Sequence, residues 1–234
     1  MKKTINILLA FLLCGSAYTS NAQENDTVSY AENDVRKNYA IYHLAKRYND
    51  PVIARMALYQ LMVFSRNESA VLDSLALEYF NQQNYVSAAL VAKDNLAINP
   101  NSEMSLEIGA ISFANIGVKD QALSYYEKLA LKNNSTNTYY QVAYLQYDLK
   151  RYTEAKTTIK ILMDRKESDE LKLVFTKLDK TNQEVPMRAA LFDLNGRIAE
   201  AQGDITAAKN FYLEALKISP GFEMAQANLS KAGK

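Results

Sequence analysis

The chain lacks most of the residues from which disulfides, metal sites and nucleophilic catalytic sites are built. Its 234 residues include one cysteine, one histidine and no tryptophan. Cys14 alone cannot close an internal disulfide, and His43 has no metal-ligating partner at the spacing of a zinc site. No HExxH, GxSxG, Walker-type or GxGxxG motif is present. We therefore expect a protein that is not an enzyme, with no catalytic residue, no cofactor and no metal ion.

Glycine, proline and an excess of charge of one sign are also scarce. The 7 glycines and 4 prolines exclude a collagen-like chain, and the abundance of Ala, Leu, Lys, Glu and Gln favours helices over sheet. The 27 Lys and Arg residues nearly balance the 26 Asp and Glu residues. Because there is no basic field to attract phosphates, the chain is not expected to bind nucleic acid.

The first 22 residues have the layout of a secretory signal peptide. Lys2 and Lys3 precede an apolar run over residues 5–14, and residues 20–22 form a small-x-small cleavage site before Gln23. The apolar run is too short to span a bilayer comfortably, and no later apolar segment is long enough either. We expect an exported, periplasmic protein that starts at Gln23 and has no membrane insertion after cleavage of the signal peptide.

Cys14 leaves a lipid-anchored alternative open. A bacterial lipoprotein signal ends in a small residue before the modified cysteine, but Leu13 occupies that position here. Membrane attachment would require acylation of Cys14, so cleavage before Gln23 is the favoured interpretation. Residues 23–34 are polar and show no hydrophobic period, and we expect them to form a flexible leader.

Small residues recur at a nearly constant interval along the rest of the chain. Aligned alanines follow one another at intervals of 34, 34, 33 and 53 residues: Ala54, Ala88, Ala122, Ala155 and Ala208. Twelve residues before each alanine stands a second aligned position, occupied by Tyr42, Ala76, Ala110, Ala143 and Gly196. Small residues at both positions let two antiparallel helices approach closely. Large apolar residues four and eight positions later, such as Tyr212 and Leu216, fill the space toward the next helix pair.

This unit resembles the tetratricopeptide repeat, a 34-residue helix–turn–helix with small, aromatic and proline residues at fixed offsets. The last copy carries Phe192, Gly196, Ala208, Tyr212, Ala215, Leu216 and Pro220 at those offsets. The second copy carries Leu75, Ala76, Tyr79, Tyr85, Ala88, Leu96 and Pro100. The resemblance implies an all-α, right-handed superhelical solenoid of antiparallel helix pairs. We expect about five repeats, over residues 35–68, 69–102, 103–135, 136–169 and 189–222, and a capping helix over residues 221–231.

The long interval between Ala155 and Ala208 contains an insert. Leu171, Val174, Phe175 and Leu178 follow the i, i+3, i+4, i+7 spacing of an amphipathic helix, so we expect a helix over residues 168–180. Two roles stay open for it. It packs on the repeats as a spacer that sets their bend, or it lies across the binding groove, where it gates the groove or docks a partner.

The resemblance also implies where a partner would bind, because the first helices of such repeats line a concave surface. The positions that would face this groove are Tyr39, His43, Arg47, Phe80, Asn81, Asn115, Tyr140, Tyr144, Tyr147 and Arg197. Tyrosines offer rigid apolar area with a hydroxyl, and asparagines bond to a peptide backbone. The alternative is that the tyrosines fill the groove against the inserted segment. A clamp for a terminal carboxylate is not expected, because Asp73, Glu107 and Tyr140 stand where its cations would be.

These observations predict a non-enzymatic scaffold of the bacterial periplasm or cell envelope that binds another protein or a peptide in its concave groove. A lipid-anchored subunit of an envelope assembly complex, attached through Cys14, and a purely structural spacer remain as alternatives. The sequence does not name the partner.

Overall fold

The computed structural model describes residues 32–64 and 68–233. The expected signal peptide, Cys14 and residues 23–31 of the expected leader lie outside these residues. Residues 32–34, assigned to the flexible leader from the sequence, are already helical, because the helix over residues 32–47 begins earlier than its apolar period indicates. In the described part of the chain, no helix combines the length and the apolar character needed to cross a membrane.

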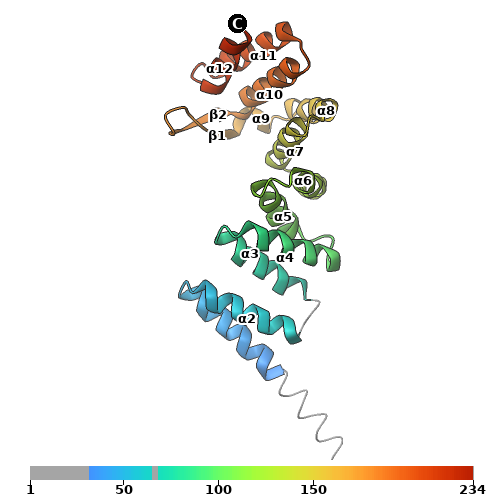
Figure 1. Ribbon diagram of the computed structural model, residues 1–234, viewed down its shortest axis with the longest axis vertical. Helices are drawn as coiled ribbons and strands as arrows, with labels where there is room; N and C mark the ends of the chain where they lie inside the picture. Colours follow the sequence, from blue (N-terminus) through green and yellow to red (C-terminus); the bar gives the residue numbers. More distant parts are fainter. Residues whose placement is uncertain (1–31, 65–67, 234) are drawn as a thin grey trace, which may run out of the picture. The chain divides into compact units, whose positions relative to one another are not determined.

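The described chain is a series of antiparallel helix pairs (Figure 1). The first pair is the helix over residues 32–47 with α2 (Pro51–Phe64). The following pairs are α3 (Ser69–Asn81) with α4 (Tyr85–Ile98), α5 (Glu103–Asn115) with α6 (Lys119–Asn133), α7 (Thr136–Asp148) with α8 (Tyr152–Met163), and α10 (Met187–Ala201) with α11 (Ile205–Ile218). The last helix, α12 (Glu223–Ala232), stands where the capping helix is expected. The predicted all-α repeat fold is confirmed.

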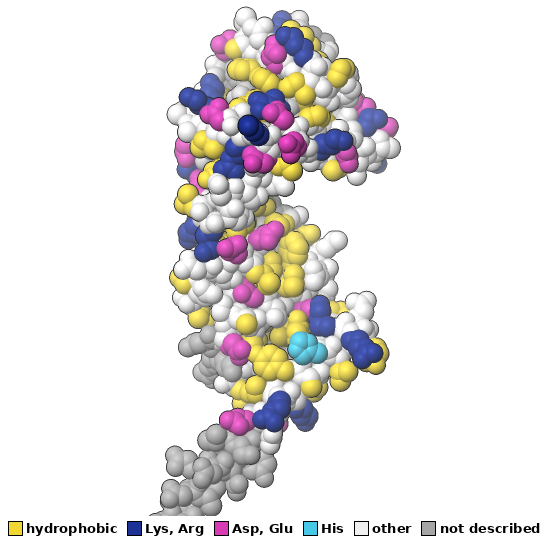
Figure 2. Space-filling view, turned by 180° about the vertical axis from the view of Figure 1, so that it is seen from behind, with side chains coloured by type: hydrophobic (Ala, Val, Ile, Leu, Met, Phe, Trp, Pro, Cys, Tyr) yellow, Lys and Arg dark blue, Asp and Glu magenta, His cyan; other side chains and the backbone are white. Residues whose placement is uncertain are grey.

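The chain divides into two compact units. The N-terminal unit ends at Ser102, and the C-terminal unit begins at Glu103. On the face of the C-terminal unit shown in Figure 2, Lys and Arg side chains are interspersed with Asp and Glu side chains. That face therefore carries no continuous field of one charge sign.

The aligned small residues lie buried in the helix packing. Ala54, Ala76, Ala88, Ala110, Ala122, Ala143, Ala155 and Ala208 are all 0% exposed. Their complete burial agrees with the close approach of helices that the spacing predicts. Gly196 leaves no room for a side chain, because a Cβ atom added there would lie 2.4 Å from Cε1 of Tyr212. The residue types at these positions are thus dictated by the distance between helices.

The turn inside each helix pair is built in the same way in all five pairs. One residue of each turn adopts a left-handed backbone conformation, at Asn49, Gln83, Gly117, Lys150 and Gly203. The next residue donates its N–H to a carbonyl five residues earlier, as from Asp204 to Ala199 at 3.0 Å and from Arg151 to Gln146 at 2.8 Å. This is the hydrogen bond of the Schellman helix ending, which satisfies carbonyls left free at the end of the first helix. Each pair therefore has a turn of fixed length.

The insert is a β-hairpin, and the predicted helix over residues 168–180 is wrong. A short helix α9 (Glu167–Glu170) is followed by β1 (Lys172–Thr176) and β2 (Asn182–Pro186), which pair antiparallel with Leu173 opposite Val185. The side chains of β1 alternate between half-buried Leu173 and Phe175 and exposed neighbours. A helix would have turned Val174 and Leu178 toward the core, but they are 66% and 89% exposed. The burial of side chains in this segment thus follows the two-residue period of a strand and not the 3.6-residue period of a helix.

The hairpin packs on the last repeat beside α9 and α10 (Figure 1). The ring of Phe175 lies 4.9 Å from the ring of buried Phe222, which precedes α12. At the hairpin turn, the backbone N–H of Leu178 donates to Oε2 of Glu223 at 3.0 Å. The insert is thereby fixed to the capping helix at one end and to α10 at the other.

Candidate binding site

The ten residues predicted to face a groove divide equally between the two units. Tyr39, His43, Arg47, Phe80 and Asn81 belong to the N-terminal unit, and Asn115, Tyr140, Tyr144, Tyr147 and Arg197 belong to the C-terminal unit.

In the N-terminal unit, the predicted residues are mostly engaged with near neighbours. The His43 ring is exposed and lies 5.5 Å from the ring of Tyr42, and exposed Arg47 lies 5.9 Å from the ring centroid of Tyr48. Phe80 packs edge-on against Tyr85 at 5.9 Å. Asn81 is exposed at the end of α3.

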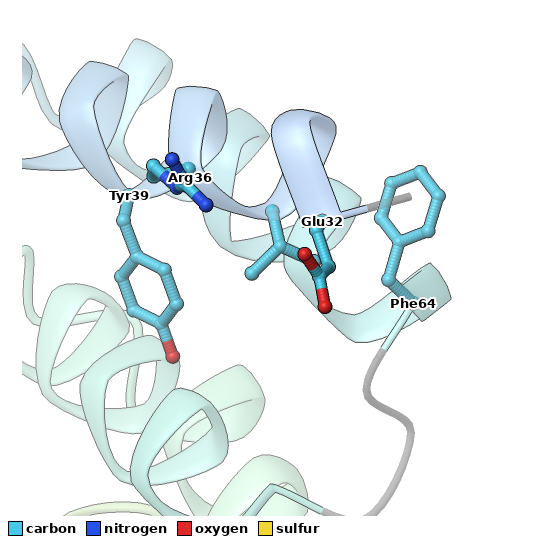
Figure 3. A pocket seen from close by; sticks show the side chains of 5 residues that line it. Glu32, Arg36, Tyr39 and Phe64 are labelled. Carbon is cyan, nitrogen blue, oxygen red and sulfur yellow. The ribbon is translucent and has the colours of Figure 1, made fainter. Parts of the chain in front are cut away.

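Tyr39 lines a pocket of about 400 Å³ together with Glu32, Val35, Arg36 and Phe64. In Figure 3, Glu32, Arg36 and Tyr39 lie along one helix, with Phe64 at the end of α2. The Tyr39 hydroxyl donates to Oε1 of Glu68 at 2.7 Å. Burial first, and then this hydrogen bond, raise the pKa of Tyr39 to about 12. Tyr39 thus ties its helix to the start of α3.

The predicted residues of the C-terminal unit come together far more closely. Tyr140, Tyr144 and Arg197 line one open pocket of about 620 Å³. Its other walls are Gln141 of α7, Leu173, Val174 and Phe175 of β1, and Met224 and Asn228 of α12. We call this space the hairpin pocket, since β1 forms one side of it. Four segments distant in sequence, α7, β1, α10 and α12, thus meet at one concave site.

Arg197 is the cation of the hairpin pocket. Its guanidinium lies 4.5 Å from the ring centroid of Tyr147 and 5.7 Å from that of Tyr144. Nη1 also contacts Sδ of Met224 at 4.0 Å. Cation–π contacts of this kind orient a guanidinium without neutralising it. The predicted tyrosines Tyr144 and Tyr147 therefore act as a platform for Arg197.

A buried carboxylic acid lies one helical turn from Arg197. Asp193 is 2% exposed, and its Oδ1 accepts a hydrogen bond from Nδ2 of Asn228 at 2.8 Å. Burial raises the pKa of Asp193 to about 6, against the lowering effects of the Asn228 hydrogen bond and of Arg197. This carboxyl connects α10 to the capping helix.

The raised pKa gives a prediction for stability against pH. An exposed aspartate has a pKa of about 3.9, so the folded protein holds the Asp193 proton more tightly than the unfolded chain does. The contribution of Asp193 to the free energy of unfolding must then fall as pH rises from about 4 to about 6. Asp193→Asn removes this dependence. The free energy of unfolding of the variant, relative to that of wild type, should therefore be higher at pH 7.5 than at pH 4 by on the order of 1–3 kcal/mol.

Urea denaturation at several pH values measures this gain. Asp164→Asn, which removes an exposed carboxylate from the same unit, is the matched control. A wild-type pH profile that Asp193→Asn leaves unchanged would contradict the raised pKa.

Two features of the site differ from what the sequence indicates. Tyr140 is only 9% exposed and belongs to the core cluster of α7, α8 and α10, so it reaches the hairpin pocket with one edge. Exposed Asn115 donates Nδ2 to the carbonyl of Ile111 in its own helix at 2.8 Å, and it does not line the pocket.

Sequence reasoning missed the pocket residues that lie outside the first helices of repeats. Leu173, Val174 and Phe175 were assigned to a helix, and Met224 and Asn228 to the cap alone. The alternation of apolar residues in β1 is the signal that could have found the strand. Its place against α10 depends on tertiary packing, which that alternation does not report.

The chain is similar to one family model and to several solved structures. Residues 194–222, the second half of α10 with α11, match the family model described as tetratricopeptide repeat. No curated protein matches the chain. Among solved structures, YrrB, described as a TPR protein with an unusual peptide-binding site, aligns with a TM-score of 0.64 and 13% identity over 80% of this chain and 87% of that one.

Two structures of MamA are also similar. One aligns with a TM-score of 0.62 and 14% identity over 81% of this chain and 93% of that one. The other, MamA from Desulfovibrio magneticus RS-1, has a TM-score of 0.58 and 13% identity over 81% and 97% of the two chains. At such identities the likeness concerns the fold, which is that of the tetratricopeptide repeats.

Proposed function

We propose that this chain, a tetratricopeptide repeat protein by its fold and by the match of residues 194–222, is a scaffold that binds another protein through the hairpin pocket. The observation that carries the proposal is the composition of that pocket. It combines an aromatic surface, one oriented guanidinium and an apolar strand within about 620 Å³. Aromatic and arginine side chains in a concave setting are typical of binding hot spots.

The size and openness of the pocket suit a peptide segment of the partner. Its aromatic, apolar and charged walls offer contacts to both side chains and backbone. The description of YrrB names a peptide-binding site in a protein of the same fold, which supports a peptide as ligand here. Action by binding, without chemistry, accords with the few catalytic side chains in the sequence.

Tyr144 is the residue with which to test the proposal. It is 37% exposed at the pocket and faces Arg197, so it can contact a ligand without being part of the core. Peptides would be selected by the wild-type protein from a displayed library of random ten-residue sequences. Tyr144→Ala should weaken binding of the selected peptides by about tenfold or more, the loss typical of a hot-spot residue.

Tyr48→Ala is the matched control, since Tyr48 is a 72% exposed tyrosine of the N-terminal unit. Isothermal titration calorimetry gives the affinities, and circular dichroism checks that both variants are folded. Failure of the library to yield any binder would favour the structural spacer, and equal affinities for wild type and Tyr144→Ala would show that the peptides bind outside the hairpin pocket.

We also propose that the protein acts after export, in the periplasm. This rests on the signal-peptide layout of residues 1–22. Intact mass of the protein from a bacterial envelope fraction tests it: a soluble chain starting at Gln23 supports export, and a diacylated chain starting at Cys14 supports the lipid-anchored alternative.

A further inference from the structure

The β-hairpin has a strand edge whose backbone groups are free. Met187 donates its N–H to the carbonyl of Leu171, and Lys177 donates to the carbonyl of Thr181, both at 2.8 Å. In an antiparallel pair, hydrogen-bonded and non-hydrogen-bonded positions alternate. The backbone groups of Leu173 and Phe175 therefore bond to β2. The backbone N–H and C=O groups of Lys172, Val174 and Thr176 point away from β2. Within the described residues the sheet has two strands only, so this edge of β1 is unpaired.

The free edge of β1 borders the hairpin pocket. Three consecutive residues of β1, from Leu173 to Phe175, line the pocket, and no residue of β2 does so. Side chains of consecutive strand residues point to opposite faces of a sheet. Because the pocket contacts side chains on both faces of the strand, it must lie along the edge of β1. Val174, at the centre, is 66% exposed.

The charge of the pocket indicates what a ligand should carry. Among the described residues, the Arg197 guanidinium has no carboxylate within the 4.0 Å of an ion pair. Its close contacts are the rings of Tyr144 and Tyr147 and the sulfur of Met224. The carboxylate of buried Asp193, one helical turn away in α10, acts on its charge but forms no ion pair with it. An oriented arginine of this kind binds a carboxylate through charge-assisted hydrogen bonds.

We propose that the hairpin pocket binds an internal, extended, acidic segment of a partner protein, which adds a third strand to the free edge of β1 and places a side-chain carboxylate against Arg197. This inference rests on the proposed function. Strand addition uses main-chain hydrogen bonds for affinity and alternate side chains for specificity. Arg197 lines the pocket together with the middle of β1, so a peptide paired along the whole strand continues past Arg197 in both directions. The carboxylate therefore comes from an Asp or Glu side chain.

The decisive variant is Val174→Pro, which deletes one outward N–H of β1. Proline is tolerated on an edge strand when its missing N–H faces away from the ladder. Glu184→Pro is the matched control, because Glu184 lies opposite Val174 and directs its N–H to the other edge of the hairpin. The probes are ten-residue peptides selected by wild type from two random libraries. One library holds the peptides between flanking sequences, and the other ends in a free carboxyl terminus.

We expect binders from the flanked library, with Asp or Glu enriched at one position. Val174→Pro should weaken them by tenfold or more, Glu184→Pro should bind them as wild type does, and Arg197→Gln should abolish the preference for the acidic residue. Near-ultraviolet and far-ultraviolet circular dichroism establishes that each variant is folded.

The failures of the two proposals are distinguishable. Peptides that lose affinity for Tyr144→Ala but bind Val174→Pro as they bind wild type would overturn strand addition and leave the binding function intact. Binders found only in the free-carboxyl library, or without acidic enrichment, would overturn the internal acidic segment. A wild-type protein that selects no peptide from either library would overturn both.

Discussion

Replacement of Tyr140 with alanine is expected to lower the free energy of unfolding by about 3–5 kcal/mol, the loss typical of a buried aromatic side chain. Tyr140 is 9% exposed and packs with Ala143, Ile159, Leu191 and Leu194 in the core of the C-terminal unit. Burial, with Asp193 nearby, raises the pKa of its hydroxyl. The side chain is therefore held by the core and not by a ligand.

Tyr144 lies one helical turn away from Tyr140 in α7, but outside the buried core. It is 37% exposed and its ring centroid lies 5.7 Å from the Arg197 guanidinium, so Tyr144→Ala should cost less than about 1 kcal/mol. Urea denaturation followed by circular dichroism measures both losses. Tyr140→Phe, which keeps the ring, should retain most of the stability. Equal losses for Tyr140→Ala and Tyr144→Ala would show that the two tyrosines do not differ in role.

Replacement of Gly196 with alanine should destabilise the protein by about 1–3 kcal/mol, although alanine favours helices over glycine. The added Cβ would lie 2.4 Å from Cε1 and 2.6 Å from Cδ1 of Tyr212. That ring cannot easily move, because Tyr212 is 0% exposed and its hydroxyl donates to Oε2 of Glu200 at 2.8 Å. The substitution therefore forces α10 and α11 apart.

Gly221→Ala is the control for Gly196→Ala, because nothing lies within 4 Å of a Cβ built at Gly221. It should change the free energy of unfolding by no more than about 0.5 kcal/mol. A double-mutant cycle with Tyr212→Leu tests the cause, since removal of the ring should relieve most of the cost of alanine at position 196. Additive losses in that cycle would mean that the ring is not the obstacle.

The helix pairs could be predicted from the sequence because their packing repeats. Two positions per unit must be small wherever helices touch, and this requirement is visible as a periodic pattern without any structure. Ala88 and Ala122, aligned by spacing alone, are both fully buried. The N-terminal limit of the first helix was less accurate, because its first residues are polar and leave no apolar period to detect.

The hairpin could not be predicted in this way. Leu171, Val174, Phe175 and Leu178 fit a helical period by coincidence, while Leu173 and Phe175 carry the alternation of the strand. Eight residues are too few to separate the two periods when apolar side chains are dense. The choice is made by tertiary packing, through the contact of Phe175 with Phe222.

For the candidate site, the sequence could predict only which side of the first helices would face a groove. The family geometry directed Tyr140, Tyr144 and Arg197 to one side, and the structure brings them to one pocket. The family geometry could not distinguish buried Tyr140 from half-exposed Tyr144, since the burial of each depends on how closely its neighbours in space pack. Nor could it place Asn228 and Val174 at the same site, because their segments meet α10 only in the folded chain.

The constant turn inside each helix pair determines where this chain can change in length. Every such turn spans three residues between its helices, and each is closed by the same backbone hydrogen bond, whether its left-handed residue is Gly203, Lys150 or Gln83. An added residue there would break that bond in the middle of a tightly packed pair. In the described residues, the large insert lies instead between two pairs, after α8 and before α10, outside these turns. The junctions between repeats are thus the sites at which such an array can acquire a new element, and with it a new specificity, without loss of its helical framework.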